Sequence, residues 1–269
     1  MIDKICAFLT KRIRKEMPEI DDERAEVIYY GLQNIVGEFP KIFIMLGIAY
    51  ILGIFKWSLF TFLALFPYKG TSGGVHLKTH IGCTIFTTMF YCVIPFVSQY
   101  IVLPQIAKYL VIACVWVFGM IMIKLYAPAD TEDVPILEEG VRKKKRVVAY
   151  ITFSLGMFVA LITDNNMIAN ILVLANLFQT ITITKFIYKL TNSKYGYEVY
   201  GDTSTEIVWY KICTGNILCY IDFYTKEGMF MLKFLAKTAE KYAKATNTAC
   251  AVVLVFHQPK MPKCMIKKD

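Results

Sequence analysis

The sequence is poor in charged residues and in histidine, and its cysteines lack the spacing of a metal site. Only 19% of its 269 residues are charged, whereas 56% are hydrophobic. A soluble globular domain has about 25% charged and about 45–50% apolar residues. The chain has three histidines, and its eight cysteines are scattered without a CxxC pair. A structural zinc site or a dithiol redox motif is therefore not indicated, and no cofactor is expected.

Charge is absent over several apolar runs of roughly 17–22 residues, the length that crosses the hydrocarbon core as a helix. The alternation typical of a membrane β-barrel is missing. We therefore expect an all-α fold, a polytopic membrane helical bundle of about six spans. These are predicted at about 42–55 (lengthened by residues from 36 onward), 57–67, 83–102, 106–125, 147–163 and 167–188.

Amphipathic segments flank these runs at both ends of the chain. Residues 2–15 and 231–245 place apolar side chains on one helical face and lysines or arginines on the other, which predicts two helices in the membrane interface. The net charge of +9 is then explained by contact with anionic lipid at the ends of spans. The expected partner of the basic residues is the lipid bilayer, and no nucleic-acid binding is expected.

The distribution of lysine and arginine predicts the orientation. The N-terminus, the loop 69–82 and the block 142–146 are basic, whereas the connections at 98–103 and 164–166 carry almost no Lys or Arg. Basic connections stay in the cytoplasm, so both termini and the loop 69–82 are predicted to be cytoplasmic. The span 57–67 is short, and a re-entrant hairpin there would leave the loop on the same side.

The character of the chain changes after Lys189 and again near residue 229. We divide it into a membrane-embedded unit at 1–190, a linker of unassigned structure at 191–228 and a separate C-terminal module at 229–269. Oligomeric state is not determined by these patterns, and a homodimer stays open.

One polar, glycine-rich interval interrupts the apolar region at Gly73–Cys83. A thiol is a good nucleophile only as its thiolate, so a cysteine nucleophile needs a nearby base or positive potential. His76 could supply the base for Cys83, and a helix starting at Cys83 could add its N-terminal dipole. The amides of Gly73 and Gly74, which lack Cβ atoms, could hold an oxyanion. Lys69 could bind a carboxylate of a peptide.

Other readings of the same residues stay open at this point. His80 is the competing base, being nearer to Cys83 in the sequence. The interval could also be an ordinary cytoplasmic turn, with solvated histidines and a small residue at a helix start. A different class of function is a non-enzymatic membrane protein that binds or exports peptides.

The run Gly73-Gly74-Val75-His76 followed by Cys83 resembles the signature of the accessory gene regulator B (AgrB) family. The segment 126–132 and the basic block 142–146 resemble the same family. This resemblance implies a membrane cysteine endopeptidase of the bacterial cell membrane that processes quorum-sensing peptide precursors. It also implies that His76 and Cys83 are the catalytic pair, and it places Lys69 where many members carry arginine.

The C-terminal module resembles a cyclic lactone autoinducer precursor, the substrate of that family. After a leader helix it has Cys250, a short apolar run that includes Leu254 and Phe256, and a polar tail from His257. The resemblance implies cleavage at 254–256, a thioester on Cys83 and capture by Cys250 as a thiolactone. The partner is a peptide precursor, for which the chain's own C-terminal segment is a candidate. Enzyme and precursor could be a natural fusion or two adjacent reading frames translated as one.

Overall fold

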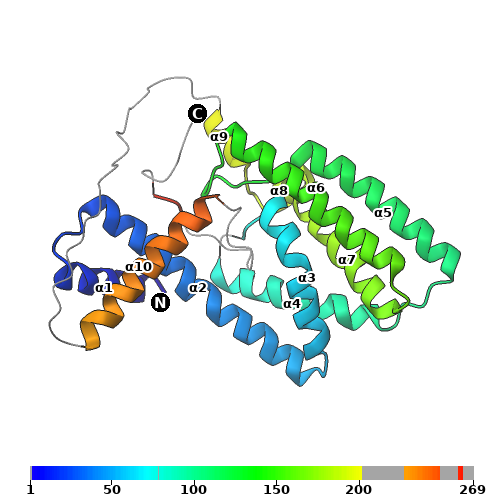
Figure 1. Ribbon diagram of the computed structural model, residues 1–269, viewed down its shortest axis with the longest axis horizontal. Helices are drawn as coiled ribbons and strands as arrows, with labels where there is room; N and C mark the ends of the chain where they lie inside the picture. The colour runs from blue at the N-terminus through cyan, green and yellow to red at the C-terminus, as the bar shows by residue number, and fades with distance from the viewer. Residues whose placement is uncertain (1, 78, 202–226, 249–259, 263–269) are drawn as a thin grey trace.

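The structure is a computed structural model that describes residues 2–77, 79–201, 227–248 and 260–262. Within these residues the protein is helical and forms no strand, which confirms the predicted all-α class (Figure 1). The helices are α1 Ile2–Glu16, α2 Asp22–Ile51, α3 Phe55–Ser72, α4 His80–Ser98, α5 Gln105–Tyr126, α6 Glu139–Ile162, α7 Asn166–Thr182, α8 Lys185–Leu190, α9 Gly196–Gly201 and α10 Glu227–Thr248.

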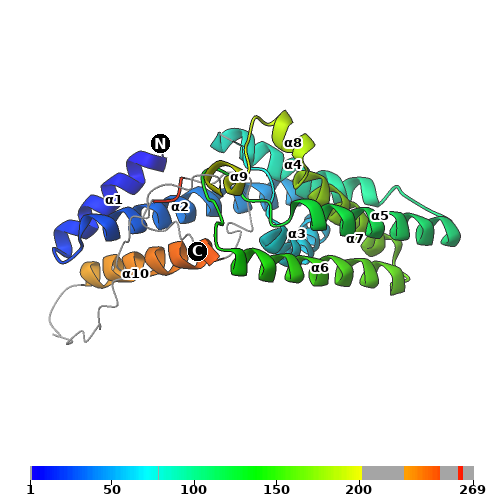
Figure 2. The same ribbon diagram turned by 90° about the horizontal axis from the view of Figure 1, so that it is seen from above.

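The long helix α2 joins two groups of helices. Its N-terminal half lies between α1 and α10, and Figure 2 shows the three running side by side. Its C-terminal half packs on α4 and α3, which lead into a bundle with α5, α6 and α7 (Figure 1). A hydrophobic core around Tyr68, Tyr91 and Phe153 fills this bundle.

Four of the described helices are long and apolar enough to cross a membrane, namely α2, α4, α5 and α6. The other two expected spans correspond to α3 and α7, which have 18 and 17 residues and are not among the four. A polytopic membrane bundle is therefore supported, while the number of six spans stays a prediction.

Pro40 neither starts nor ends a helix, although it lies just before the predicted core of the first span at 42–55. It lies inside α2, which is continuous from Asp22 to Ile51. A proline removes one backbone hydrogen bond of a helix interior, but the turns on both sides of Pro40 remain helical. As a result Glu38 and Lys41 lie on one helix, less than one turn apart.

The two amphipathic helices form as predicted, but their apolar faces also meet protein. In α1, Cys6 and Ile13 are buried. Burial, and to a smaller extent the Asp3 carboxylate, raises the pKa of Cys6 to about 11. In α10 the buried residues are three alanines one helical turn apart, Ala236, Ala239 and Ala243. These small side chains let α10 lie close to α2, where a Cβ added to Gly31 would be 2.0 Å from the Ala239 carbonyl oxygen.

Candidate functional site

Cys83 lies in the first turn of α4 and is fully buried. Thr79 caps this helix: its side-chain oxygen accepts a hydrogen bond from Gly82 N at 3.2 Å, as preferred N-cap residues do. Its carbonyl oxygen accepts from Cys83 N at 3.0 Å. The helix therefore begins three residues before the predicted start. The sulfur still lies within the turn where the helix dipole favours a negative charge.

The sulfur of Cys83 lies in a buried cluster of charged and polar groups. Lys41 Nζ is 3.7 Å from Cys83 Sγ, and Thr87 Oγ1 is 4.0 Å from it. Lys41 Nζ in turn lies 3.0 Å from Glu38 Oε1. The Lys41 and Glu38 side chains are only 4% and 2% exposed. An ammonium group is therefore held beside the thiol in a site that excludes water.

Lys69 belongs to the same cluster. It is 5% exposed, and it is close enough to Cys83 and Glu38 to interact with both electrostatically. Its Nζ lies 6.0 Å from the centre of the Tyr91 ring, within the range of a cation–π contact. With Lys41, Lys69 and Glu38 all ionised, the groups around the thiol carry one net positive charge, which would offset a thiolate.

Ionisable groups inside a helical membrane protein are costly and mark functional sites by default. The sequence pattern did not indicate Lys41 and Glu38 as site residues. The available signal was an acid and a base three residues apart at the start of an apolar run, which places both on one face of a helix. That they face Cys83 follows only from the packing of α2 on α4.

The two loop glycines are explained by close packing. Gly73 has φ +74°, and a Cβ there would lie 2.2 Å from Ala129 O. Gly74 has φ +144°, and a Cβ there would lie 2.9 Å from Thr182 Oγ1. Such positive φ values favour glycine.

The amides of these glycines already donate hydrogen bonds, Gly73 N to Lys69 O at 3.1 Å and Gly74 N to Ala129 O at 3.0 Å. Both amides are thus engaged within the protein in this conformation, and the oxyanion hole at Gly73 and Gly74 stays a prediction.

His76 lies on the extended segment that follows these glycines. Val75 N donates to Thr182 O at 3.2 Å, and Ser193 Oγ donates to His76 O at 3.4 Å. The segment is thus fixed against the end of α7 and the turn after α8. The competing base, His80, is the first residue of α4, and its ring lies against Gly37 of α2. The choice of His76 as the base for Cys83 stays a prediction.

Described residues on both sides of 249–259 contact the rest of the chain. In the C-terminal half of α10, burial and then the Glu38 carboxylate raise the pKa of Tyr242 to about 12. Further along, Met261 is 2% exposed and its N donates to Asp133 O at 2.8 Å. The predicted ring residues Cys250, Leu254 and Phe256 lie outside the described residues.

Among the described residues, four helices are long and apolar enough to cross a membrane, and two of them, α2 and α4, bring Glu38, Lys41 and Cys83 together in a buried cluster. The sequence model of the family "Accessory gene regulator B" matches residues 6–183. The chain belongs to the accessory gene regulator B family, whose members take part in processing quorum-sensing peptides.

Relatives of known name agree with this assignment. An AgrB-like protein of Listeria monocytogenes serotype 4b (strain CLIP80459) is 29% identical over 70% of this chain and 91% of that protein. Accessory gene regulator protein B of Staphylococcus aureus (strain bovine RF122 / ET3-1) is 28% identical over 68% of this chain and 91% of that protein. No solved structure matches the chain. The family match ends before α8, so it does not include the C-terminal module.

Proposed function

We propose that this protein is a membrane cysteine endopeptidase that removes the C-terminal tail of a quorum-sensing peptide precursor and retains the remainder as a thioester. Membership of the accessory gene regulator B family supports a role in processing a quorum-sensing peptide. The observation that carries the chemistry is the contact of Cys83 Sγ with Lys41 Nζ, 3.7 Å apart in a buried cluster. Lys41 and Lys69 stabilise the thiolate, and His76 accepts its proton.

The reaction follows from these groups. The Cys83 thiolate attacks a peptide carbonyl carbon at 254–256 of the precursor segment, and the carbonyl oxygen becomes an oxyanion. Lys41 is close enough to the sulfur to donate to this oxygen. Collapse of the intermediate breaks the C–N bond, and His76 returns its proton to the leaving amine. The products are a thioester on Cys83 and a free C-terminal tail.

The thioester suits cyclisation. The Cys250 thiol gives its proton to His76 and attacks the acyl carbon, the Cys83 thiolate leaves, and a thiolactone forms. One thioester replaces another, so most of the bond energy is retained, whereas hydrolysis would release it. An attacking thiol on the same peptide also has a high effective concentration.

Contacts of the C-terminal module support the chain's own segment 229–269 as the substrate. α10 packs along α2, the helix that carries Glu38 and Lys41. Arg24 Nη2 of α2 and Glu240 Oε2 of α10 lie 3.2 Å apart. Met261, which follows the cleavage region in the sequence, also contacts the rest of the chain, since its N donates to Asp133 O.

The test is release of the C-terminal tail, measured by mass spectrometry on membranes containing the full chain. Cys83→Ala and His76→Ala should each abolish release, whereas Cys250→Ala should allow cleavage and prevent the ring. Cys92→Ala is the matched control, because Cys92 is another buried cysteine of α4. Unchanged release from Cys83→Ala would refute the proposal.

A further inference from the structure

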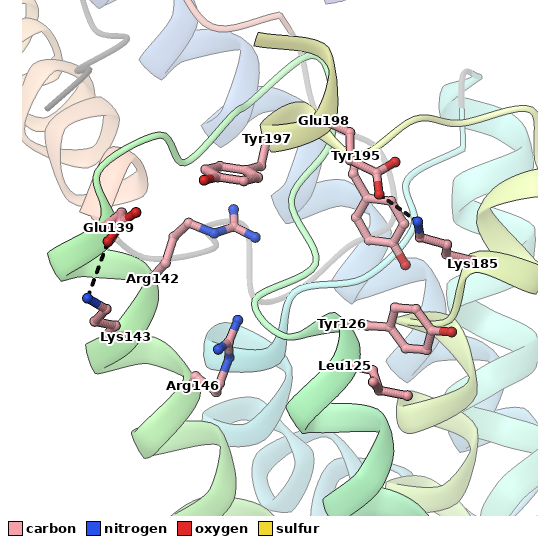
Figure 3. Close-up of a pocket in the computed structure, with 10 residues that line it drawn as sticks. All are labelled: Leu125, Tyr126, Glu139, Arg142, Lys143, Arg146, Lys185, Tyr195, Tyr197 and Glu198. Atoms are coloured by element: carbon pink, nitrogen blue, oxygen red, sulfur yellow. Dashed lines mark ion pairs between the residues drawn. The ribbon is translucent and has the colours of Figure 1, made fainter. Parts of the chain in front are cut away.

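A cavity of about 340 Å³ lies where α5 ends and α6 begins, with α8 and α9 along its other side (Figure 3). None of the residues of the Cys83 cluster lines it. Its lining has four cationic side chains, two carboxylates and three tyrosine rings. The lining therefore carries two net positive charges when these groups are in their ordinary ionised states.

Both carboxylates of the lining are engaged by lysines near the rim. Lys143 Nζ lies 3.2 Å from Glu139 Oε2, and Lys185 Nζ lies 2.7 Å from Glu198 Oε1. These side chains are all more than half exposed. The remaining positive charges of the cavity belong to the two arginines of α6.

Main-chain oxygens hold both arginines in place, but the two differ in whether a carboxylate pairs with the guanidinium. Arg142 donates to Ile136 O at 3.0 Å, forms a 3.2 Å ion pair with Asp130, and lies 4.4 Å from the centre of the Tyr197 ring. Arg146 Nε donates to Ala127 O at 2.7 Å. In the part of the chain that the structure describes, no carboxylate pairs with Arg146. The excess positive charge is thus on a fixed guanidinium, which Figure 3 shows on the same side of α6 as that of Arg142.

The position of the cavity suits a lipid headgroup. It lies between the last turn of α5 and the first turns of α6, two helices that are long and apolar enough to span a membrane. Tyrosine rings and basic side chains at the ends of spans are typical of the headgroup level. Leu125 also lines the cavity and is 58% exposed, so it offers an apolar surface beside the charged one.

We propose that this cavity binds the phosphate group of an anionic phospholipid, with the phosphate on Arg146 and an acyl chain along Leu125. A guanidinium matches phosphate oxygens with two parallel hydrogen bonds, and basic pockets between membrane helices bind anionic headgroups. Free inorganic phosphate shares this chemistry without the acyl chain. The proposal does not depend on the peptidase function.

Binding there would act on the loop between α5 and α6. Arg142 and Arg146 hold the carbonyl groups of Pro128 and Ala127, and the next residue, Ala129, accepts the hydrogen bond of Gly74 N. A bound headgroup would fix both arginines and thereby stabilise the loop that packs on the glycines.

The experiment titrates the purified full-length protein, in uncharged detergent, with phosphatidylglycerol and separately with phosphatidylcholine. Native mass spectrometry measures bound lipid. Phosphatidylglycerol should bind more tightly to the wild type, and Arg146→Gln should weaken that binding about tenfold, as expected for one lost charge-assisted contact. Lys144→Gln is the matched control, because it removes the same charge from an exposed neighbour on α6 outside the cavity.

Two further arms complete the test. Inorganic phosphate is added as a competitor: full displacement at millimolar phosphate would assign the site to free phosphate, whereas retained lipid supports the headgroup. Lys185→Gln is the second cavity variant if Arg146→Gln fails to fold, and it should also weaken phosphatidylglycerol binding. The proposal is overturned if the Arg146→Gln and Lys144→Gln proteins bind phosphatidylglycerol equally, or if the wild type does not distinguish the two lipids.

Discussion

Single residues set the charge around the Cys83 sulfur. Lys41 lies 3.7 Å from Sγ and is itself paired with Glu38, so the thiol meets a fixed ammonium group in addition to any histidine. Cys83 was a candidate nucleophile from the sequence, because it ends a glycine- and histidine-containing loop that resembles a family signature. The position of Lys41 beside the sulfur could not be predicted from the sequence, because it depends on the packing of α2 on α4.

Substitution of Lys41 tests its role in the chemistry. Lys41→Met should lower tail release by about 100-fold, the effect of removing one donor from an oxyanion or thiolate site. Lys41→Arg, which keeps the charge, should lower tail release by a smaller factor.

Removing one partner of a buried ion pair also destabilises a protein, so a structural effect has to be separated. The double variant Glu38→Gln/Lys41→Met contains neither charge and should recover the melting temperature without recovering tail release. Recovery of both the melting temperature and tail release would show that Lys41 has only a structural role.

Whole elements determine how the site is supported. The loop between α5 and α6 is fastened to α6 through Asp130, which lies 3.2 Å from Arg142 and accepts a hydrogen bond from Ile136 N at 2.9 Å. Burial nevertheless outweighs these contacts and raises the pKa of Asp130 above its usual value. The basic block, expected to contact lipid, thus also ties a loop to its own helix.

The pH dependence of stability should show this titration. A carboxyl group whose pKa is raised in the folded state holds its proton more tightly there, so folding stability falls as pH rises through that pKa. Asp130→Asn removes the titration and keeps an acceptor for Ile136 N. We expect the melting temperature of the wild type to fall more between pH 4 and pH 7 than that of the variant. Equal slopes would contradict the raised pKa.

The contact between α2 and α10 can be tested with paired glycines of α2. Gly31→Ala would place a Cβ 2.0 Å from Ala239 O, whereas at Gly47 a Cβ would meet nothing within 4 Å. Both changes raise helix propensity equally, so the difference reports on the contact. Gly31→Ala should speed trypsin cleavage at the α10 lysines and reduce tail release, and Gly47→Ala should do neither. Equal rates of trypsin cleavage in both variants would show that α10 does not need the close approach of Gly31 to Ala239.

At the scale of the whole molecule, residues distant in the sequence converge near Asp133. Met261 packs in one small buried cluster with Tyr30 of α2, Val134 of the α5–α6 loop and Ala243 of α10. This cluster joins α10 and Met261 to α2 and to the loop between α5 and α6.

Truncation of Met261 tests this junction. Met261→Ala removes a buried side chain and should cost about 2–5 kcal/mol locally, which frees the tail and lowers its rate of release. Lys260→Ala is the control, because Lys260 is exposed and its loss should leave release unchanged. Release rates are compared by mass spectrometry. Identical rates in both variants would mean that this anchor has no part in positioning the tail.

The all-α fold class and most of the helices could be predicted from the sequence, because length and hydropathy suffice to predict apolar helices. The sequence also indicated Cys83 as the candidate nucleophile, since a thiol beside glycines and a histidine stands out in an apolar chain. Only the tertiary structure decided that α2 continues through Pro40, that Lys41 and Glu38 face Cys83, and that Gly73 and Gly74 serve packing. The physical reason is that these features depend on which helix faces meet. Local propensity and hydropathy specify each helix, whereas the choice of facing residues comes from the packing of α2, α3 and α4 together.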